Sequence, residues 1–321
     1  MKIIVTGGAG FVGSCIVKTL NDIGVSDILI VDNIQSSEKW INISNKTYTA
    51  YINKNEFINT LNEYKDYTHI IHMGACSSTL ETNFDYLYNN NYLFTKKLWD
   101  FCVKNKMCFI YASSAATYGD GRNGFSDYTD IKQLLPLNAY GYSKHLFDMW
   151  VEKQNELPKQ YVGLKFFNVY GPNEYCKNQM ASMVYHGYKQ IAERGIFKLF
   201  KSYNSKFLDG EQKRDFIYVK DVCKIIKFFL ENPTLNGLFN VGTGKAESFN
   251  FLAKSLFQAL QIIPNIEYID MPDKLRKHYQ YFTEADNRKL CEIGYNEGFY
   301  SLSEGVYDYV NNYLQRDFLV Y

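Results

Sequence analysis

Three residues of the sequence carry the functional groups needed to move a proton to and from an alcohol oxygen. Tyr140 and Lys144 are four positions apart in NAYGYSK, and Ser114 precedes them in ASSAATYG. Residues i and i+4 share one face of a helix, so the ammonium of Lys144 would lie beside the phenol of Tyr140. A phenol with a pKa of about 10 is a poor base at neutral pH, and a nearby cation favours its ionised form. We therefore expect Tyr140 to act as an acid/base, with Ser114 donating to the same oxygen.

Spacing alone does not single out this pair, because Tyr-x-x-x-Lys strings arise by chance in a chain with 28 tyrosines. The distinguishing feature is Ser114, which follows a β-rich run at residues 109–112. Doubly wound α/β sheets bind their ligands at the carboxyl ends of the strands. The position of Ser114 therefore favours a catalytic trio over three ordinary surface or core residues.

A glycine-rich stretch near the start of the chain, GGAGFVG, is typical of a phosphate-binding turn. Gly7, Gly10 and Gly13 follow a β-rich run at residues 3–6 and open a helix-length stretch. The start of a helix presents unpaired N–H groups to a pyrophosphate, and glycines let the backbone approach it. Asp32 ends the next β-rich run about 20 residues later, where dinucleotide-binding units carry a ribose-binding acid. We predict dinucleotide binding over the alternative of a tight turn with a capping aspartate.

The residues by themselves leave the choice between NAD and NADP open. Asp32 alone indicates NAD, because a carboxylate repels a 2′-phosphate. Lys39 and Lys54 follow it, and either could supply the compensating charge for NADP, although each taken singly is an ordinary surface lysine. With either cofactor, the oxidised nicotinamide would further favour the phenolate of Tyr140, and Lys144 would also hold the nicotinamide ribose.

The elements that must position these residues alternate in type along the first half of the chain. Short β-rich runs at 3–6, 28–31, 69–73 and 109–112 are separated by helix-length segments such as 11–23. This order predicts a doubly wound parallel α/β sheet of the Rossmann type, followed by a smaller mixed α/β domain. We place the dinucleotide-binding domain at 1–170 and the substrate-binding domain at 171–321, with stretches near 216–245 and 275–295 returning to the first. The polar stretch 201–213 is expected to be an exposed loop.

Composition excludes several classes of partner. Lys and Arg number 35 against 34 Asp and Glu, a net charge of +1, so no broad basic field exists to bind nucleic acid or an anionic membrane. No apolar run approaches the roughly 18 residues of a membrane span, and the apolar stretch near the start is too short for a signal peptide, so we expect a cytoplasmic protein. Seven scattered cysteines without a CxxC pair predict buried thiols, with neither a disulfide framework nor a metal site.

Further motifs support a family resemblance. With the glycine turn and the Ser-Tyr-Lys trio, NVYGP, RDF and NVGTG follow in order, and the chain resembles the extended short-chain dehydrogenase/reductases, most of which act on nucleotide sugars. The blocks VTGGAGFVGS, GACSST, FFNVYGPNE, KRDFIYVKDV, FNVGTGKAESF and HYQYFTEAD resemble those of the ADP-L-glycero-D-manno-heptose 6-epimerases within that family.

This resemblance implies a tightly bound NADP, with NAD less favoured, a homo-oligomer that is commonly a pentamer, and a second acid/base, Lys177, beside Tyr140. The residues implied at the cofactor are Gly7, Gly10, Phe11, Val12, Gly13, Asp32, Asn33, Lys39, Lys54, Met73, Gly74, Ala75, Cys76, Ser77, Asn90, Lys144, Val169 and Lys177. Those implied at the nucleotide sugar are Ser114, Asn168, Gln179, His186, Phe200, Lys201, Ser202, Tyr203, Arg214 and Tyr279. Arg214 has independent support, since its planar fork suits a diphosphate.

The activity implied is inversion at C6 of an ADP-heptose, by oxidation to a ketone and return of the same hydride to the opposite face, for the heptose of lipopolysaccharide cores. The alternatives are another nucleotide-sugar epimerase, a reductase or a 4,6-dehydratase, including an enzyme for a differently activated heptose. Ala115 and Ala116 stand where such dehydratases carry an acid pair, which argues against dehydration. A non-catalytic dinucleotide sensor is a further alternative. Such proteins tend to lose the catalytic Tyr or Lys, whereas this chain retains Ser114, Tyr140 and Lys144, which argues against it.

Overall fold

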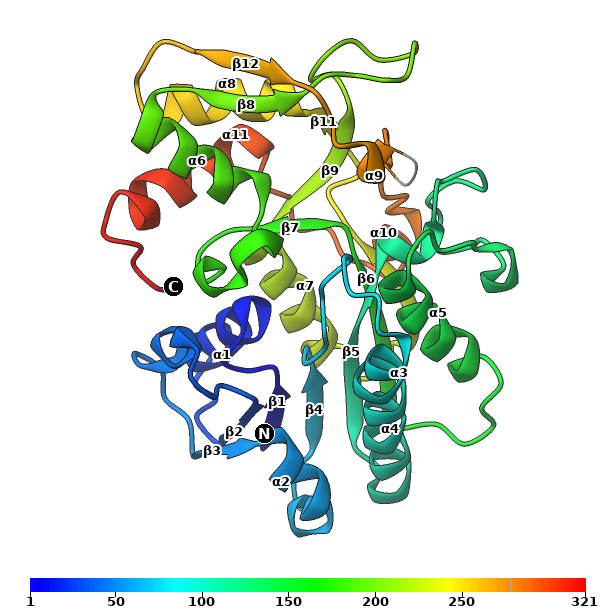
Figure 1. Cartoon of the computed structure of the whole chain (residues 1–321). Helices are drawn as coiled ribbons and strands as arrows, with labels where there is room; N and C mark the ends of the chain where they lie inside the picture. The colour runs from blue at the N-terminus through cyan, green and yellow to red at the C-terminus, as the bar shows by residue number, and fades with distance from the viewer. Residues whose placement is uncertain (277–278) are drawn as a thin grey trace.

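The computed structural model describes residues 1–276 and 279–321 and is built around a seven-stranded parallel sheet (Figure 1). The strand order is β10-β6-β5-β4-β1-β2-β3. This doubly wound sheet confirms the fold predicted from the sequence. Its strands are β1 (Ile3–Thr6), β2 (Ile28–Asp32), β3 (Ala50–Asn53), β4 (His69–His72), β5 (Cys108–Ser114), β6 (Gln160–Phe166) and β10 (Gly237–Val241).

Both faces of the central sheet are covered, which is why its strands are almost continuously apolar. In β1, Ile3 and Val5 pack in one cluster with α1 (Phe11–Asp22) and α7 (Val219–Glu231), whereas Ile4 packs in a second. The second cluster includes residues of α4 (Phe94–Asn105) and α5 (Ala139–Val151). The remaining helices beside this sheet are short: α2 (Lys54–Asn59), α3 (Phe84–Leu87), α10 (Arg288–Glu292), η1 (Glu38–Ile43), η2 (Leu61–Tyr64), η3 (Tyr88–Leu93), η4 (Ala115–Tyr118) and η5 (Ile131–Gln133).

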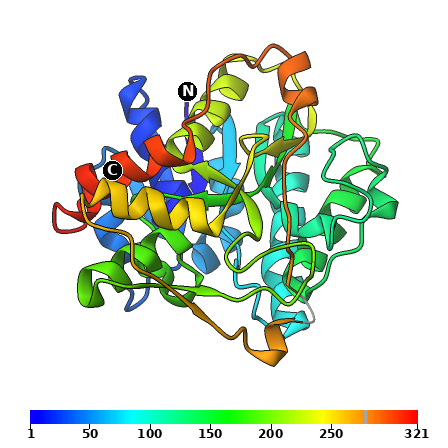
Figure 2. The same ribbon diagram turned by 90° about the horizontal axis from the view of Figure 1, so that it is seen from above.

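A smaller mixed α/β part lies above the carboxyl ends of the central strands in Figure 1. Its strand β9 (Lys213–Tyr218) pairs parallel with β7 (Asn168–Tyr170) and antiparallel with β11 (Ala246–Ser248), and β8 (Phe197–Phe200) pairs with β12 (Ile266–Ile269). Figure 2 shows α8 and α11 side by side. The helices of this part are α6 (Met183–Arg194), α8 (Phe249–Ala259), α9 (Asp273–Arg276), α11 (Leu302–Tyr309), η6 (Tyr175–Met180) and η7 (Val310–Leu314).

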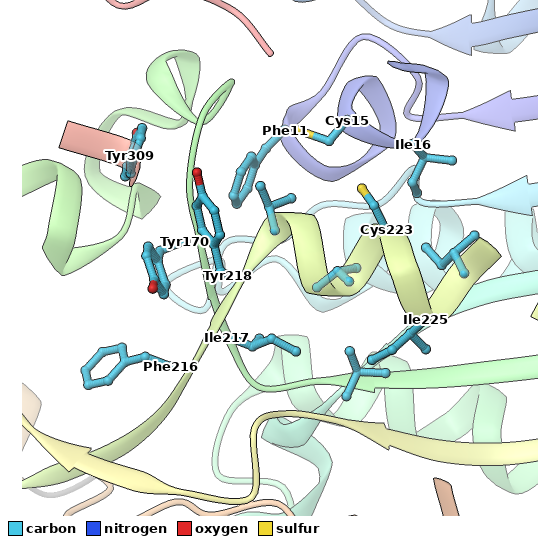
Figure 3. Close-up of a cluster of buried hydrophobic side chains, with 14 of the residues drawn as sticks. Phe11, Cys15, Ile16, Tyr170, Phe216, Ile217, Tyr218, Cys223, Ile225 and Tyr309 are labelled. Carbon is cyan, nitrogen blue, oxygen red and sulfur yellow. The ribbon is translucent and has the colours of Figure 1, made fainter. Parts of the chain in front are cut away.

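One apolar core runs through both parts (Figure 3). Cys15 and Ile16 of α1 and Ile225 of α7 belong to the same buried cluster as Ile217 of β9 and Tyr309 of α11. Burying each such side chain contributes about 1.5–3 kcal/mol. The glycine turn before α1 and the strand that carries Arg214 are therefore held on one packed framework. Because β10 lies beyond residue 170 and still pairs with β6, the division into 1–170 and 171–321 stays a prediction.

Two surface properties bear on the sequence predictions. Over residues 1–276 and 279–321, the structure contains no helix long and apolar enough to cross a membrane. Burial is observed for Cys15, Cys102, Cys108 and Cys223, whereas Cys76 and Cys176 are only half-buried and Cys291 is exposed. The prediction of a buried thiol is wrong for Cys291, because the short helix α10 buries only Leu290.

Candidate active site

The glycine turn between β1 and α1 is too tight for side chains. Gly7 has φ +68°, and a Cβ atom there would lie 2.6 Å from the backbone nitrogen of Gly74. A Cβ atom at Gly13 would lie 2.1 Å from the carbonyl oxygen of Gly7. Gly10, which precedes α1, has no side chain to cap the first N–H groups of the helix. The turn therefore presents backbone donors and open space to an anion, as a pyrophosphate site requires.

Two adjoining cavities, of about 720 and 180 Å³, extend from this turn along the carboxyl ends of the central strands. Their combined size suits a dinucleotide with part of a second ligand. All the predicted cofactor residues line one or both cavities. The larger is lined by Gly7, Gly10, Phe11, Val12, Gly13, Asp32, Lys39, Met73, Gly74, Ala75, Cys76, Ser77, Lys144, Val169 and Lys177, and the smaller by Asn33, Lys54 and Asn90 among others.

Asp32 lies in this cavity system with its charge compensated. The residue is 7% exposed, and its carboxylate accepts hydrogen bonds from the backbone nitrogens of Ala9 at 3.0 Å and Asn33 at 2.6 Å. The Lys39 ammonium pairs with it at 2.6 Å. Lys54 donates to Asn90 at 2.5 Å, and burial lowers the pKa of Lys54 while Asp32 raises it. Two ammonium groups thus accompany the single carboxylate at the ribose end of the site.

The Ser-Tyr-Lys trio comes together at the larger cavity. Ser114 is the last residue of β5, and Tyr140 lies in the first turn of α5, where the Asn138 side chain accepts from the Gly141 nitrogen at 2.8 Å. Lys144, one turn further along α5, donates to the Ala112 carbonyl at 2.9 Å. Strand end and helix start therefore converge on the same space, as the sequence predicts.

The ionisation of Tyr140 differs from the sequence prediction. Burial raises the pKa of Tyr140, and a hydrogen bond with Ser114 lowers it only in part. The expected lowering by the Lys144 cation is not seen: the phenol loses water on burial, and the ammonium donates to the Ala112 carbonyl. Burial also lowers the pKa of Lys144 to about 8. The protein groups alone therefore favour a neutral phenol.

Asn91 is a site residue that the sequence reasoning missed. Its buried side-chain amide accepts from the Cys76 nitrogen at 2.8 Å and donates to the Cys76 carbonyl at 3.0 Å and to the Ser143 hydroxyl at 3.0 Å. Ser143 in turn donates to the Tyr140 carbonyl at 2.7 Å. Asn91 lies in η3, a π-helical turn of the kind often found at functional sites. Three consecutive asparagines inside a helical stretch were the signal that could have identified it.

Lys177 reaches the same cavity from a loop. It lies in η6, where Asn178 has φ +50°, and its ammonium is 5.4 Å from the centroid of the Phe11 ring. Burial lowers the pKa of Lys177, and the nearby Glu174 raises it. Tyr140 and Lys177, the two predicted acid/bases, thus line one cavity from different elements.

Glu174 closes the loop that carries Lys177 and was also missed. Its buried carboxylate accepts from the Gly171 nitrogen at 3.2 Å, the Ser182 hydroxyl at 2.8 Å and the Ser182 nitrogen at 2.5 Å. These bonds join the start and the end of the loop 171–182. Burial raises the pKa of Glu174. A glutamate directly after GPN in the FFNVYGPNE block was the available signal.

The predicted substrate residues divide into those at the cavity and those beside it. Ser114, Asn168 and Gln179 line the larger cavity. Arg214 lies one residue layer behind it: its guanidinium is 5.8 Å from the ring of Phe249, which lines the cavity, and 5.1 Å from the ring of Tyr279. The Arg214 fork donates to the carbonyls of Lys213, at 2.8 Å, and Gln280.

His186 and the stretch 200–203 lie outside both cavities. His186 is on α6 beside the Tyr185 ring. Lys201 pairs with Asp270 at 3.3 Å, the Ser202 nitrogen donates to Asp209 at 2.7 Å, and the Tyr203 ring packs 3.8 Å from the Arg276 guanidinium. The loop 201–212 contacts Asp270, Arg276 and Tyr281 rather than the cavity, and it is not exposed throughout, since Gln212 is buried. Substrate binding by His186, Phe200 and the three residues that follow it stays a prediction.

Comparisons with known proteins agree with this geometry. The family model described as the NAD dependent epimerase/dehydratase family matches residues 3–242. The chain is 50% identical to an ADP-L-glycero-D-manno-heptose-6-epimerase of Fusobacterium nucleatum, over 98% of each chain, and 48% identical to one of Nitratidesulfovibrio vulgaris, over 97% of each. The crystal structure of the Helicobacter pylori ADP-L-glycero-D-manno-heptose-6-epimerase superposes with a TM-score of 0.78 at 27% identity, covering 97% of this chain and 95% of that one.

Proposed function

The chain belongs to the NAD-dependent epimerase/dehydratase family and is an enzyme of the epimerase class, and we propose that it inverts C6 of ADP-D-glycero-D-manno-heptose to give the L-glycero epimer. The relatives at 50% and 48% identity that carry this activity in their names support the substrate. The observation that carries the proposal is the convergence of Tyr140 and Lys177, two acid/bases from different elements, on the cavity that begins at the glycine turn.

The cofactor is a nicotinamide dinucleotide, and we propose NADP rather than NAD. When bound, it accepts a hydride from C6 and returns it. The glycine turn, the stretch 73–77 and Val169 would hold it, because their backbone leaves the space and the donors that a dinucleotide needs. Lys39 and Lys54 favour a 2′-phosphate, since their charges offset the repulsion from Asp32.

The chain's own residues move the proton of the C6 hydroxyl. Tyr140, in the phenolate form that the bound oxidised nicotinamide and the Lys144 ammonium would favour, takes it as C6 becomes a ketone, and Ser114 donates a hydrogen bond to the same oxygen. After the sugar has turned its other face, a proton must be returned to an oxygen in a second orientation. Lys177, whose pKa is lowered by burial, supplies the second acid/base. Inversion therefore needs both residues.

For the nucleotide part, Phe216 and Phe249 form an aromatic wall of the cavity with ring centroids 5.6 Å apart. Arg214 lies directly behind Phe249, so a shift of its fork would bring two donors to a diphosphate. Tyr279, His186 and the stretch 200–203 complete the proposed substrate set. We further propose a cytoplasmic homo-oligomer, with a pentamer as the form to test, that supplies heptose for lipopolysaccharide cores.

The decisive experiment is incubation with ADP-D-glycero-D-manno-heptose followed by proton NMR of the sugar. We expect the L-glycero epimer to form in heavy water without exchange at C6, because the same hydride returns. Absence of that product would refute the substrate assignment, and a parallel incubation with the GDP-activated heptose tests the nucleotide. Mass spectrometry of the cofactor released by acid distinguishes NADP from NAD.

A further inference from the structure

A buried ion pair lies one helical turn beyond Lys144 and has no part in the proposed chemistry. The Asp148 carboxylate and the Lys165 ammonium are 2.7 Å apart, with side chains 0% and 3% exposed. Asp148 belongs to α5 and Lys165 to β6. Neither residue lines either of the two cavities described above, so the pair belongs to the layer beneath the site.

Asp148 continues the line of the catalytic residues along the helix. Tyr140, Lys144 and Asp148 are spaced i, i+4 and i+8 and therefore share one face of α5. From cavity to core, this face presents a phenol, an ammonium and a carboxylate. Each group is one helical turn from the next, so a rotation of α5 would move all three together.

The pair also ties the helix to the strand end that carries Ser114. The Asp148 carboxylate accepts from the Ser113 hydroxyl at 2.6 Å and from the Tyr111 hydroxyl at 3.1 Å. Lys165 donates to the Thr117 hydroxyl at 2.9 Å. These partners come from β5 and η4, on both sides of Ser114 in the chain. The register between Ser114 and the helix with Tyr140 and Lys144 therefore depends on this network.

A buried ion pair contributes little net free energy to folding. Removing two charges from water costs about as much as their attraction returns, and apolar replacements of the same volume are often neutral or stabilising. A network in which every partner is satisfied does specify one arrangement of the core. Because the Asp148–Lys165 network lies one helical turn from Lys144, it can influence the position and the charge of that lysine.

We propose that Asp148, anchored by Lys165, is a positioning residue that fixes α5 against the end of β5 and supplies the negative charge that keeps the Lys144 ammonium protonated at the cavity. This inference rests on the roles proposed for Tyr140 and Lys144. The charged and titratable groups facing Lys144 are His72 on β4, Cys76 after it, and Tyr140 and Asp148 on its own helix.

The charges around Lys144 fit this role. Burial lowers the pKa of Lys144 to about 8, and Asp148 is the larger of the two neighbours that raise it. Asp148 itself is faced by Lys165 of β6, Tyr111 of β5 and Tyr118 of η4, by His145 of α5, and by Glu152 directly after that helix. Without the carboxylate, the lysine would lose its proton at a lower pH and would no longer present a cation beside Tyr140.

The test compares Asp148→Asn, Lys165→Met and the double variant, in which the buried pair becomes neutral. A carbon-13 label at lysine Cε reports the protonation of Lys144 in the intact holoenzyme, and Lys144→Arg assigns its signal. In Asp148→Asn and in the double variant, we expect the pKa of Lys144 and the basic limb of kcat/KM to move to lower pH by about one unit. In Lys165→Met, neither should move downward.

Two controls separate charge from packing. Lys46, whose pKa burial also lowers to about 8, should not move in any variant, and the exposed Glu152→Gln should leave Lys144 unchanged. A wild-type Lys144 titration and wild-type kcat/KM in the double variant would overturn the proposal, as would equal downward shifts in both single variants. Because the labelled titration needs no turnover, it remains decisive even if the heptose is not the substrate, and failed epimerisation alone refutes only the proposed function.

Discussion

The two proposed acid/bases are held by different kinds of structure. Tyr140 lies in the first turn of a 13-residue helix, and the carbonyl of Tyr140 itself accepts the Ser143 hydroxyl that Asn91 contacts. Lys177 lies in a six-residue turn containing a left-handed asparagine, and Glu174 joins the two ends of its loop. One acid/base is therefore part of the sheet-and-helix framework, and the other depends on a single buried carboxylate.

This difference suits the proposed inversion at C6. The hydride must leave and return at a fixed place, so the residue nearest the framework needs a fixed register with the glycine turn. The ketone, by contrast, has to present both faces within one cavity. A proton donor on a loop can follow the oxygen to its second orientation more readily than one on a helix. We therefore expect substitutions around Tyr140 to lower the catalytic rate without loss of stability. Substitutions in the loop of Lys177 should lower both the catalytic rate and the free energy of unfolding.

The largest effect is expected for Tyr140→Phe. Loss of the phenolic proton should lower kcat by about 10³-fold, within the range typical of general acid–base catalysis, while cofactor binding stays nearly unchanged. Kinetics with the heptose substrate and titration with the cofactor measure the two quantities. If this variant turned over normally, Tyr140 would have no part in proton transfer.

Lys39→Met tests the positive charge beside Asp32 in the cofactor cavity. Removing the ammonium that pairs with Asp32 at 2.6 Å should weaken NADP binding by roughly 10- to 100-fold, the value of a charge-assisted hydrogen bond. NAD binding should change much less, because NAD lacks the 2′-phosphate. Calorimetric titration with both dinucleotides gives the ratio. The same substitution at the exposed Lys153 is the matched control, and equal losses for NAD and NADP would contradict the proposed role.

Glu174→Gln probes the loop side. An amide replaces a carboxylate that accepts three hydrogen bonds, so we expect a loss of about 2 kcal/mol in the free energy of unfolding and about a tenfold fall in kcat as Lys177 is displaced. Urea denaturation and steady-state kinetics measure these changes. Glu193→Gln, an exposed change of the same kind on α6, should alter neither quantity. An unchanged kcat in Glu174→Gln would mean that the loop keeps Lys177 in place without its carboxylate.

The smallest effect concerns pH and the framework side. Burial lowers the pKa of Lys144 from its usual 10.5 to about 8, so the folded protein binds fewer protons than the unfolded chain between these values. The free energy of unfolding should therefore rise with pH across this window, by about 2 kcal/mol between about pH 7.5 and 9.5 for this residue. Urea denaturation at pH 7.5 and 9.5 would show a smaller rise in Lys144→Met. An identical rise in that variant would show that Lys144 is not the group responsible.

The sequence predicted the framework better than the connections within it. Alternating β-rich and helical segments, the glycine turn and Ser114 at a strand end are local patterns, and each reappears in the structure. Asn91, Glu174 and the Asp148–Lys165 pair were missed because their partners are distant in the chain and depend on packing. The stretch 200–203 was placed at the substrate by resemblance, but the loop that follows it holds it against Asp270 and Arg276. Residues within local motifs could be predicted from the sequence, whereas side-chain partners brought together by the tertiary fold could not.

The pairing of β10 with β6 has a consequence for how the protein can be made. β10 closes one side of the central sheet, although about 70 residues separate it in sequence from β6. A fragment ending near residue 170 would leave the seven residues of β6 as an open edge, with unpaired backbone groups ready to join another chain. The cofactor-binding half would then associate through that edge rather than remain as an isolated unit. Expression of the protein in two pieces would need both pieces present as the sheet forms.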